Sequence, residues 1–123
     1  MRNLRNSDLR IRDIRKLIGY KSYNITWDKG CDETSEWVIA SVENQKYFER
    51  LTNWLGSKKI SPENEALLVV GSWASIERIH WINILESPIN YFGKGLFHLY
   101  DLDLNWVIEI HQEIARFGRY RNN

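Results

Sequence analysis

The chain has 123 residues, of which 43% are hydrophobic and 27% are charged, and its formal net charge is +1. This composition argues against a disordered chain and against a general nucleic-acid binder, and the length suits one domain with its own core. The single cysteine, Cys31, excludes an intramolecular disulfide and fits a reducing compartment. The chain begins without an apolar signal-peptide segment and has no run of about 18 apolar residues, so we expect a cytoplasmic protein with no membrane contact.

Apolar residues at helical spacing predict a first helix over residues 8–18, from an N-cap at Ser7 to a stop at Gly19. The outer face of this helix is rich in arginine. A solvated surface is the ordinary interpretation of such a face, and a face that contacts phosphates or an acidic partner is the alternative.

Alternating residues over 21–27 predict a strand, which is followed by an exposed acidic segment, residues 28–36. Residues 37–42 are rich in β-branched side chains and predict a second strand, antiparallel to the first. A helix then begins near Asn44 and stops at Gly56. One long helix over residues 37–55 is the alternative that the same residues allow.

The continuous apolar run at residues 66–70 predicts a central strand that is covered on both faces. Apolar residues at every third position after Ser72 predict a helix over residues 73–85, although residues 80–85 also fit a strand. Neither stretch carries a catalytic motif.

A β-hairpin is predicted over residues 95–113, because both of its arms alternate apolar and polar side chains. A register that keeps the two apolar sets on one face leaves residues 102–105 as the loop, since a slip by one residue would turn one set to water. The predicted pairs are Asp101 with Trp106, Leu99 with Ile108 and Phe97 with Ile110. Together these elements predict a single α+β domain over residues 1–123, with a mainly antiparallel sheet and two or three packed helices.

The same register places His98, Glu109 and His111 on the other face of the hairpin, with His98 opposite Glu109. A cross-strand His and Glu pair on a polar sheet face is the common explanation. Two imidazoles and a carboxylate are also possible ligands of Zn²⁺ or a possible acid and base, but nothing in the sequence supplies a further ligand or a cleft. No phosphate loop, nucleophile elbow, dinucleotide fingerprint or paired-cysteine motif occurs. We therefore predict no catalytic residues, no metal and no cofactor.

Charge and aromatic content point to a protein-binding surface. Residues 28–36 carry four carboxylates and one lysine, which ordinarily serve solvation. The alternative is that these carboxylates steer a basic partner and take the place of the phosphates that it binds. The chain also has six tryptophans, and an aromatic anchor beside charge is the usual make-up of an interface hot spot. The predicted partner-binding residues are Asp28, Asp32, Glu33, Glu36 and Trp37, with Asp101 and Asp103 as a second edge.

The segment FHLYDLDLNWVIEIHQE, residues 97–113, resembles the terminal hairpins of small bacterial immunity proteins from polymorphic-toxin and contact-dependent growth inhibition systems. The resemblance lies in an aromatic strand, a turn that contains aspartates and a following strand that begins with tryptophan. It implies a cytoplasmic protein without catalysis of its own, which binds and blocks the toxic domain of a cognate effector, often a nuclease. These families vary so much in sequence that the resemblance assigns no functional residue.

Two other functions fit parts of the sequence. A small metal-dependent hydrolase would use His98, Glu109 and His111, whereas a nucleic-acid-binding or regulatory module would use the arginine-rich first helix. The sequence leaves the partner's identity and the oligomeric state open.

Overall fold

The computed structural model describes residues 4, 10–30, 35–92 and 95–121. The helices are α1 (Ile11–Lys21), α2 (Gln45–Gly56) and α3 (Trp81–Glu86), with short 3₁₀ turns η1 (Ser22–Asn24) and η2 (Pro88–Asn90). The strands are β1 (Ile25–Trp27), β2 (Val38–Ile39), β3 (Glu65–Val70), β4 (Ser75–His80), β5 (Leu96–Asp101), β6 (Trp106–His111) and β7 (Ile114–Tyr120). No helix within the described ranges is long and apolar enough to cross a membrane.

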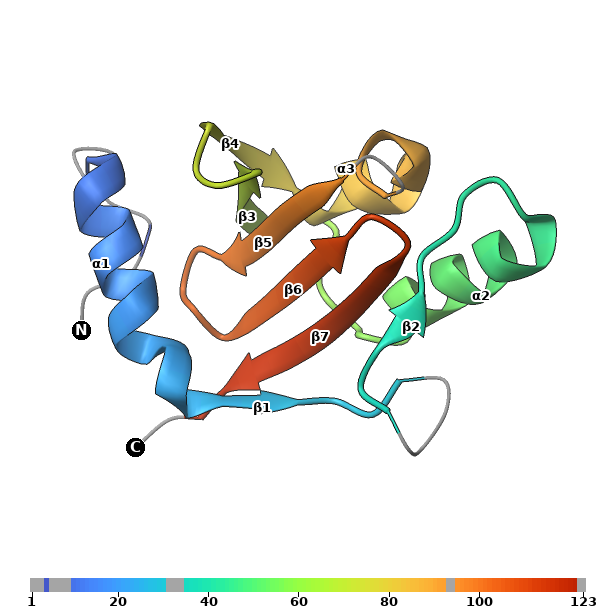
Figure 1. Ribbon diagram of the computed structural model, residues 1–123, viewed down its shortest axis with the longest axis horizontal. Helices are drawn as coiled ribbons and strands as arrows, with labels where there is room; N and C mark the ends of the chain where they lie inside the picture. The colour runs from blue at the N-terminus through green and yellow to red at the C-terminus, as the bar shows by residue number, and fades with distance from the viewer. Residues whose placement is uncertain (1–3, 5–9, 31–34, 93–94, 122–123) are drawn as a thin grey trace.

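The seven strands of the described residues join one antiparallel sheet, in the order β1-β7-β6-β5-β3-β4, with β2 also paired to β7 (Figure 1). The predicted α+β class is therefore confirmed. In the predicted hairpin, β5 and β6 pair in the expected register, with Leu99 opposite Ile108 and Phe97 opposite Ile110. The need to keep both apolar sets on one face was sufficient to determine this register.

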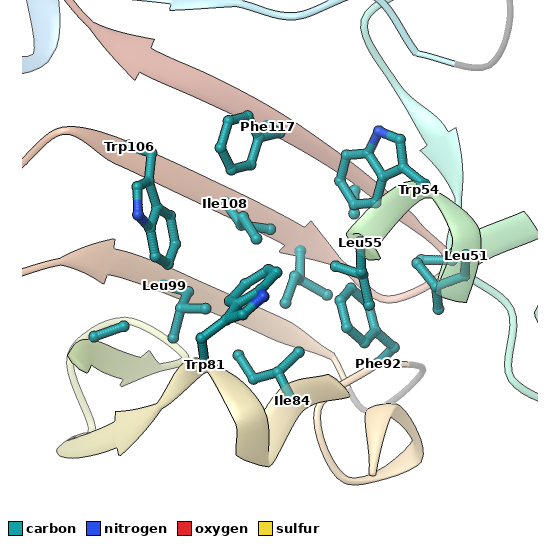
Figure 2. Packing of buried hydrophobic residues seen from close by; sticks show 14 of the residues in the cluster. Leu51, Trp54, Leu55, Trp81, Ile84, Phe92, Leu99, Trp106, Ile108 and Phe117 are labelled. Carbon is teal, nitrogen blue, oxygen red and sulfur yellow. The ribbon is translucent and has the colours of Figure 1, made fainter. Parts of the chain in front are cut away.

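One face of the sheet packs against α2 and α3 and forms the larger core (Figure 2). Leu51 and Leu55 of α2 and Ile84 of α3 are fully buried there against Ile108 of β6. Tryptophan and phenylalanine rings fill the space above the central strands: Trp81 meets Trp106 edge-on at 5.4 Å between ring centroids, and Trp106 stacks on Phe117 at 5.9 Å. Three of the six tryptophans, Trp54, Trp81 and Trp106, are thus part of the core rather than of a surface.

The opposite face is only partly covered. Leu102, Leu104 and Val107 lie in a second buried cluster with Ile14 and Ile18 of α1. Figure 1 shows α1 beside the loop that joins β5 to β6, at the end of the sheet away from the β6–β7 turn. Residues at the β6–β7 turn on this face, such as His111 and Ile114, are exposed.

The first helix and first strand differ from their predicted boundaries. Within the described residues α1 continues through Gly19 to Lys21, and the predicted N-cap Ser7 lies outside the described residues. Ser22 ends the helix, because both its backbone N–H and its hydroxyl donate to the carbonyl of Gly19. The predicted strand over residues 21–27 therefore shortens to β1.

The region from 37 to 56 is a strand followed by a helix, as predicted, and one long helix is wrong. The side chain of Asn44 accepts hydrogen bonds from the backbone N–H groups of Lys46 and Tyr47 and so starts α2. The strand is only two residues long, and it pairs with β7 rather than with β1. Both β1 and β2 lie against β7, at Gly118–Tyr120 and at Ile114–Ala115 respectively, so one long strand serves both as a partner.

The helix predicted over residues 73–85 is wrong for residues 75–80, which form β4, and is confirmed for residues 81–85, which lie in α3. The alternative strand over residues 80–85 is wrong beyond His80. Gly71 and Trp73 have positive φ values of 59° and 67°, and the chain turns back there to pair β4 with β3. Ile76 and Ile79 lie on opposite faces of β4: Ile79 belongs to the larger core, and Ile76 packs against the second cluster. Because both positions are apolar and three residues apart, the sequence shows the spacing of a helix. The helix α3 begins only at Trp81. The central strand at residues 66–70 is confirmed by β3, which lies between β4 and β5 with both faces buried.

Candidate functional site

The part of the sheet face that α1 leaves open carries a group of polar side chains. His98 of β5, Glu109 of β6 and Arg116 of β7 lie side by side in register across three strands, and His111 follows Glu109 on the same face. We call these four residues the polar cluster. The expectation that the two histidines and Glu109 share one face is therefore confirmed, whereas Arg116 was not expected there.

Arg116 joins two carboxylates that are distant in the sequence. Its Nε and Nη2 atoms each lie 3.0 Å from Oε2 of Glu109, and its Nη1 contacts Oε1 of Glu36. Two carboxylates around one guanidinium leave the group with one negative charge. Because the side chains of Arg116 and Glu109 are only 20% and 19% exposed, their pairing is stronger than an exposed ion pair.

Two tryptophans enclose the same guanidinium. The Cζ atom of Arg116 lies 3.6 Å from the ring centroid of Trp27, on β1, and 4.5 Å from that of Trp37, just before β2. A guanidinium over an indole face is attracted by the ring quadrupole. Arg116 therefore ties β1 and the start of β2 to β7, in addition to holding Glu109.

The two histidines converge on Glu109. His111 Nε2 lies 3.5 Å from Glu109 Oε2, and one ligand atom from each of His98, Glu109 and His111 lies within 4.8 Å of the others. Burial lowers the pKa of His98 below its ordinary value, opposed by the charge of Glu109 and helped by the neighbouring His111 and Arg116. His98 is therefore neutral at physiological pH and retains a ring nitrogen lone pair.

A row of rings runs from the polar cluster toward α1. His98 stacks on Tyr100 at 5.9 Å between ring centroids, and Tyr100 stacks on Trp73 at 6.4 Å. His98 and His111 meet edge-on at 6.2 Å, and His111 meets Trp37 at 5.4 Å. Burial raises the pKa of Tyr100 to about 12, with a smaller contribution from the charge of Glu109, so its hydroxyl stays protonated at neutral pH.

The predicted acidic surface is only partly described, because Asp32 and Glu33 lie outside the described residues. Asp28 is half-buried and pairs with Lys58 at 3.1 Å and with Arg119 at 3.4 Å. Glu36 pairs with Arg116. Asp28 and Glu36 are therefore paired with this chain's own cations, which sequence reasoning did not anticipate.

The predicted second edge requires a correction. Asp101 is only 1% exposed, and its carboxylate accepts hydrogen bonds from Asn64 Nδ2 at 3.1 Å and from the backbone N–H of Asn105 at 3.0 Å. The interpretation of Asp101 as a partner-binding residue is wrong, because the carboxylate shapes the hairpin turn from inside the fold. Asp103 is half-buried in the same turn.

An apolar patch lies beside the polar cluster. Ile39 of β2 and Ile114 of β7 are directly opposite each other in the sheet and are 46% and 40% exposed. Trp37, two residues before Ile39, also lines an open pocket of about 300 Å³ together with Trp27, Lys29, Ser35 and Glu36. We call Trp37, Ile39 and Ile114 the Trp37 patch. Its two isoleucines are adjacent only through the pairing of β2 with β7, so local sequence patterns carried no signal for it.

The arginine-rich face of α1 is exposed at Arg12, Arg15 and Lys16, and Arg15 lies over the ring of Trp73 at 5.6 Å from its centroid. The nucleic-acid hypothesis for this face stays a prediction.

Comparison of the chain with models of known protein families, with curated proteins and with solved structures finds no match. A proposal about function therefore depends on the arrangement of the side chains.

Proposed function

We propose that the chain is an inhibitory binding protein of the immunity type, which neutralises a toxic protein domain by covering it. The observation that carries the proposal is the Trp37 patch, where two isoleucines with large exposed fractions lie opposite each other beside a tryptophan. Exposed aliphatic side chains next to an aromatic anchor, with charged groups around them, are the usual composition of the centre of an interface.

The partner that fits this surface is a basic domain. Residues 28–36 adjoin the patch in the sequence and include Asp32 and Glu33 in addition to the paired Asp28 and Glu36. A basic active-site cleft that binds phosphates, as in a nuclease, would be attracted by this segment and closed by the apolar contact. Such an inhibitor needs shape and charge rather than chemistry of its own.

The supporting side chains favour a rigid surface. Trp37 is held by the guanidinium of Arg116 and by the ring of His111. A side chain that is already ordered loses little conformational entropy when a partner binds, and this raises affinity for the same contact area.

The experiment is co-expression of the chain with the product of the gene immediately upstream, followed by affinity pull-down, native mass spectrometry and a growth-rescue assay. A stoichiometric complex and rescue of growth are the expected results. Ile114→Lys should weaken the complex by at least about tenfold, because a hot-spot truncation costs at least about 2 kcal/mol and the new charge repels a basic partner.

Ile89→Lys is the matched control. Ile89 is also an exposed isoleucine, 55% exposed, but it lies on η2 and outside the patch. Its replacement should leave the complex unchanged. Equal effects of the two substitutions, or a toxic partner that never forms a complex, would contradict the proposed surface.

A further inference from the structure

Two imidazoles and one carboxylate converge at the open end of the sheet, and this donor set has a specific chemistry. His98, Glu109 and His111 come from the adjacent strands β5 and β6 and share one face. Imidazole and carboxylate together are typical ligands of Zn²⁺, whereas Ca²⁺ and Mg²⁺ prefer oxygen alone.

The distances are close to those of a bound ion. Two ligand atoms of a tetrahedral Zn²⁺, each about 2.0–2.1 Å from the metal, lie about 3.3 Å apart. His111 Nε2 and Glu109 Oε2 are 3.5 Å apart, which already matches this spacing. All three donor atoms lie within 4.8 Å of one another, so the set closes by side-chain movements of the order of 1 Å.

The surroundings of the three residues resemble the supporting shell of a metal site. Arg116 donates to Oε2 of Glu109, the same oxygen that lies 3.5 Å from His111 Nε2, and so fixes the orientation of the carboxylate. The ring of Tyr100 stacks on His98, and the ring of Trp37 meets the edge of His111. Each of the three donors is therefore held by a second side chain.

The positive charge of Arg116 repels a nearby cation, but the two carboxylates that pair with it outweigh this charge. Glu36 and Glu109 both pair with this one guanidinium, so the group retains one negative charge. An incoming dication thus meets a net attraction.

We propose that His98, Glu109 and His111 bind one Zn²⁺, with a fourth position open to water or to a group of a binding partner. The side chain of His111 is 46% exposed, so the ion reaches the site from solvent without opening the fold. The site does not depend on the proposed inhibitory function, since the three ligands belong to one chain and bind the ion in the absence of a partner.

The test is calorimetric titration of the full chain with Zn²⁺ after treatment with a chelator and dialysis. One Zn²⁺ per chain is the expected stoichiometry for the wild type. His111→Ala should raise the dissociation constant for Zn²⁺ by at least roughly 10–100-fold. That is the loss of affinity caused by removing only a hydrogen bond that supports a ligand. His98→Ala should do the same, and Co²⁺ should give a visible tetrahedral spectrum that is lost in both variants.

Two controls separate this site from adventitious binding. His80, the remaining histidine, is exposed at the start of α3, and Cys31 is the single thiol of the chain. His80→Ala and Cys31→Ser should bind Zn²⁺ as the wild type does. Because His111 is exposed, His111→Ala should fold normally. It therefore tests Zn²⁺ binding even where His98→Ala fails to fold. Absence of binding by the wild type, or stoichiometric binding that survives His111→Ala, would overturn the proposal.

Discussion

Glu109 and Arg116 lie directly opposite each other on β6 and β7, and two nitrogens of the guanidinium lie 3.0 Å from one carboxylate oxygen. The same guanidinium lies between the rings of Trp27 and Trp37. Through this one side chain, two short edge strands and two carboxylates are attached to the longest strand of the sheet.

Replacement of Arg116 by Ala should therefore lower the free energy of unfolding by about 2–4 kcal/mol, since it leaves the mostly buried Glu109 carboxylate without its cation and removes two cation–π contacts. Arg116→Lys should recover only part of this loss, because lysine lacks the planar fork and the stacking surface. Urea denaturation measures both variants. Arg119→Ala, which removes an exposed ion pair with Asp28, should cost less than about 1 kcal/mol. A cost for Arg116→Ala as small as that of Arg119→Ala would contradict the structural role.

The lowered pKa of His98 makes stability depend on pH in the metal-free protein. The folded state binds a proton at His98 less readily than the unfolded chain does, so protonation favours unfolding. The stability that comes from a neutral His98 is fully present above the pKa of about 6.5 that histidine has in the unfolded chain. It is lost as pH falls through the lower pKa of His98 in the folded state. In the presence of a chelator, the wild type should lose more stability between about pH 8 and pH 5 than His98→Gln does. Parallel pH profiles of the two proteins would refute the assignment.

Gly118 marks a close approach between β7 and β1. A Cβ atom at this position would lie 2.6 Å from Cγ2 of Ile25 and 2.8 Å from Cε3 of Trp27. Gly118→Ala should therefore destabilise the fold by about 1–3 kcal/mol, which is the usual cost of overpacking. Gly56→Ala, at the end of α2 with nothing within 4 Å of the added atom, should be neutral or stabilising. Thermal melts of the pair provide the comparison, and equal melting temperatures would be inconsistent with the packing.

Asp101 should matter for folding rather than for binding. Asp101→Ala leaves the Asn64 side-chain amide and the Asn105 backbone N–H without their acceptor, at a cost of about 1–3 kcal/mol for buried groups. We expect a lower melting temperature and, below that temperature, unchanged affinity for the partner. A loss of affinity without a loss of stability would return Asp101 to the interface.

The charges of Asp32 and Glu33 should act on the rate of association with a basic partner. Reversal of both to lysine should slow association and flatten its dependence on salt, because electrostatic steering is screened by ions. Stopped-flow measurements at low and high salt report this directly. An unchanged association rate would exclude the acidic segment from steering.

Local rules in the sequence were sufficient for several elements. The register of β5 and β6 followed from keeping two apolar sets on one face, and α2 followed from its Asn44 cap and the final Gly56. The same register placed His98, Glu109 and His111 on one face. In each case the informative residues lie within one element or in a pair of strands joined by a short loop.

Arrangements between distant segments were decided only by the tertiary structure. Ile76 and Ile79 resembled one helical face because the sheet has a core on each side. Nothing within residues 114–120 indicated that this segment, β7, pairs with β1, β2 and β6. The position of Arg116 between Trp27 and Trp37 likewise depends on pairings that span most of the chain. Local propensity and periodicity report what one segment buries, whereas the choice of a distant partner depends on how several buried surfaces fit together at once. The hairpin is therefore a property of the sequence alone, and the site around Arg116 is a property of the assembled sheet.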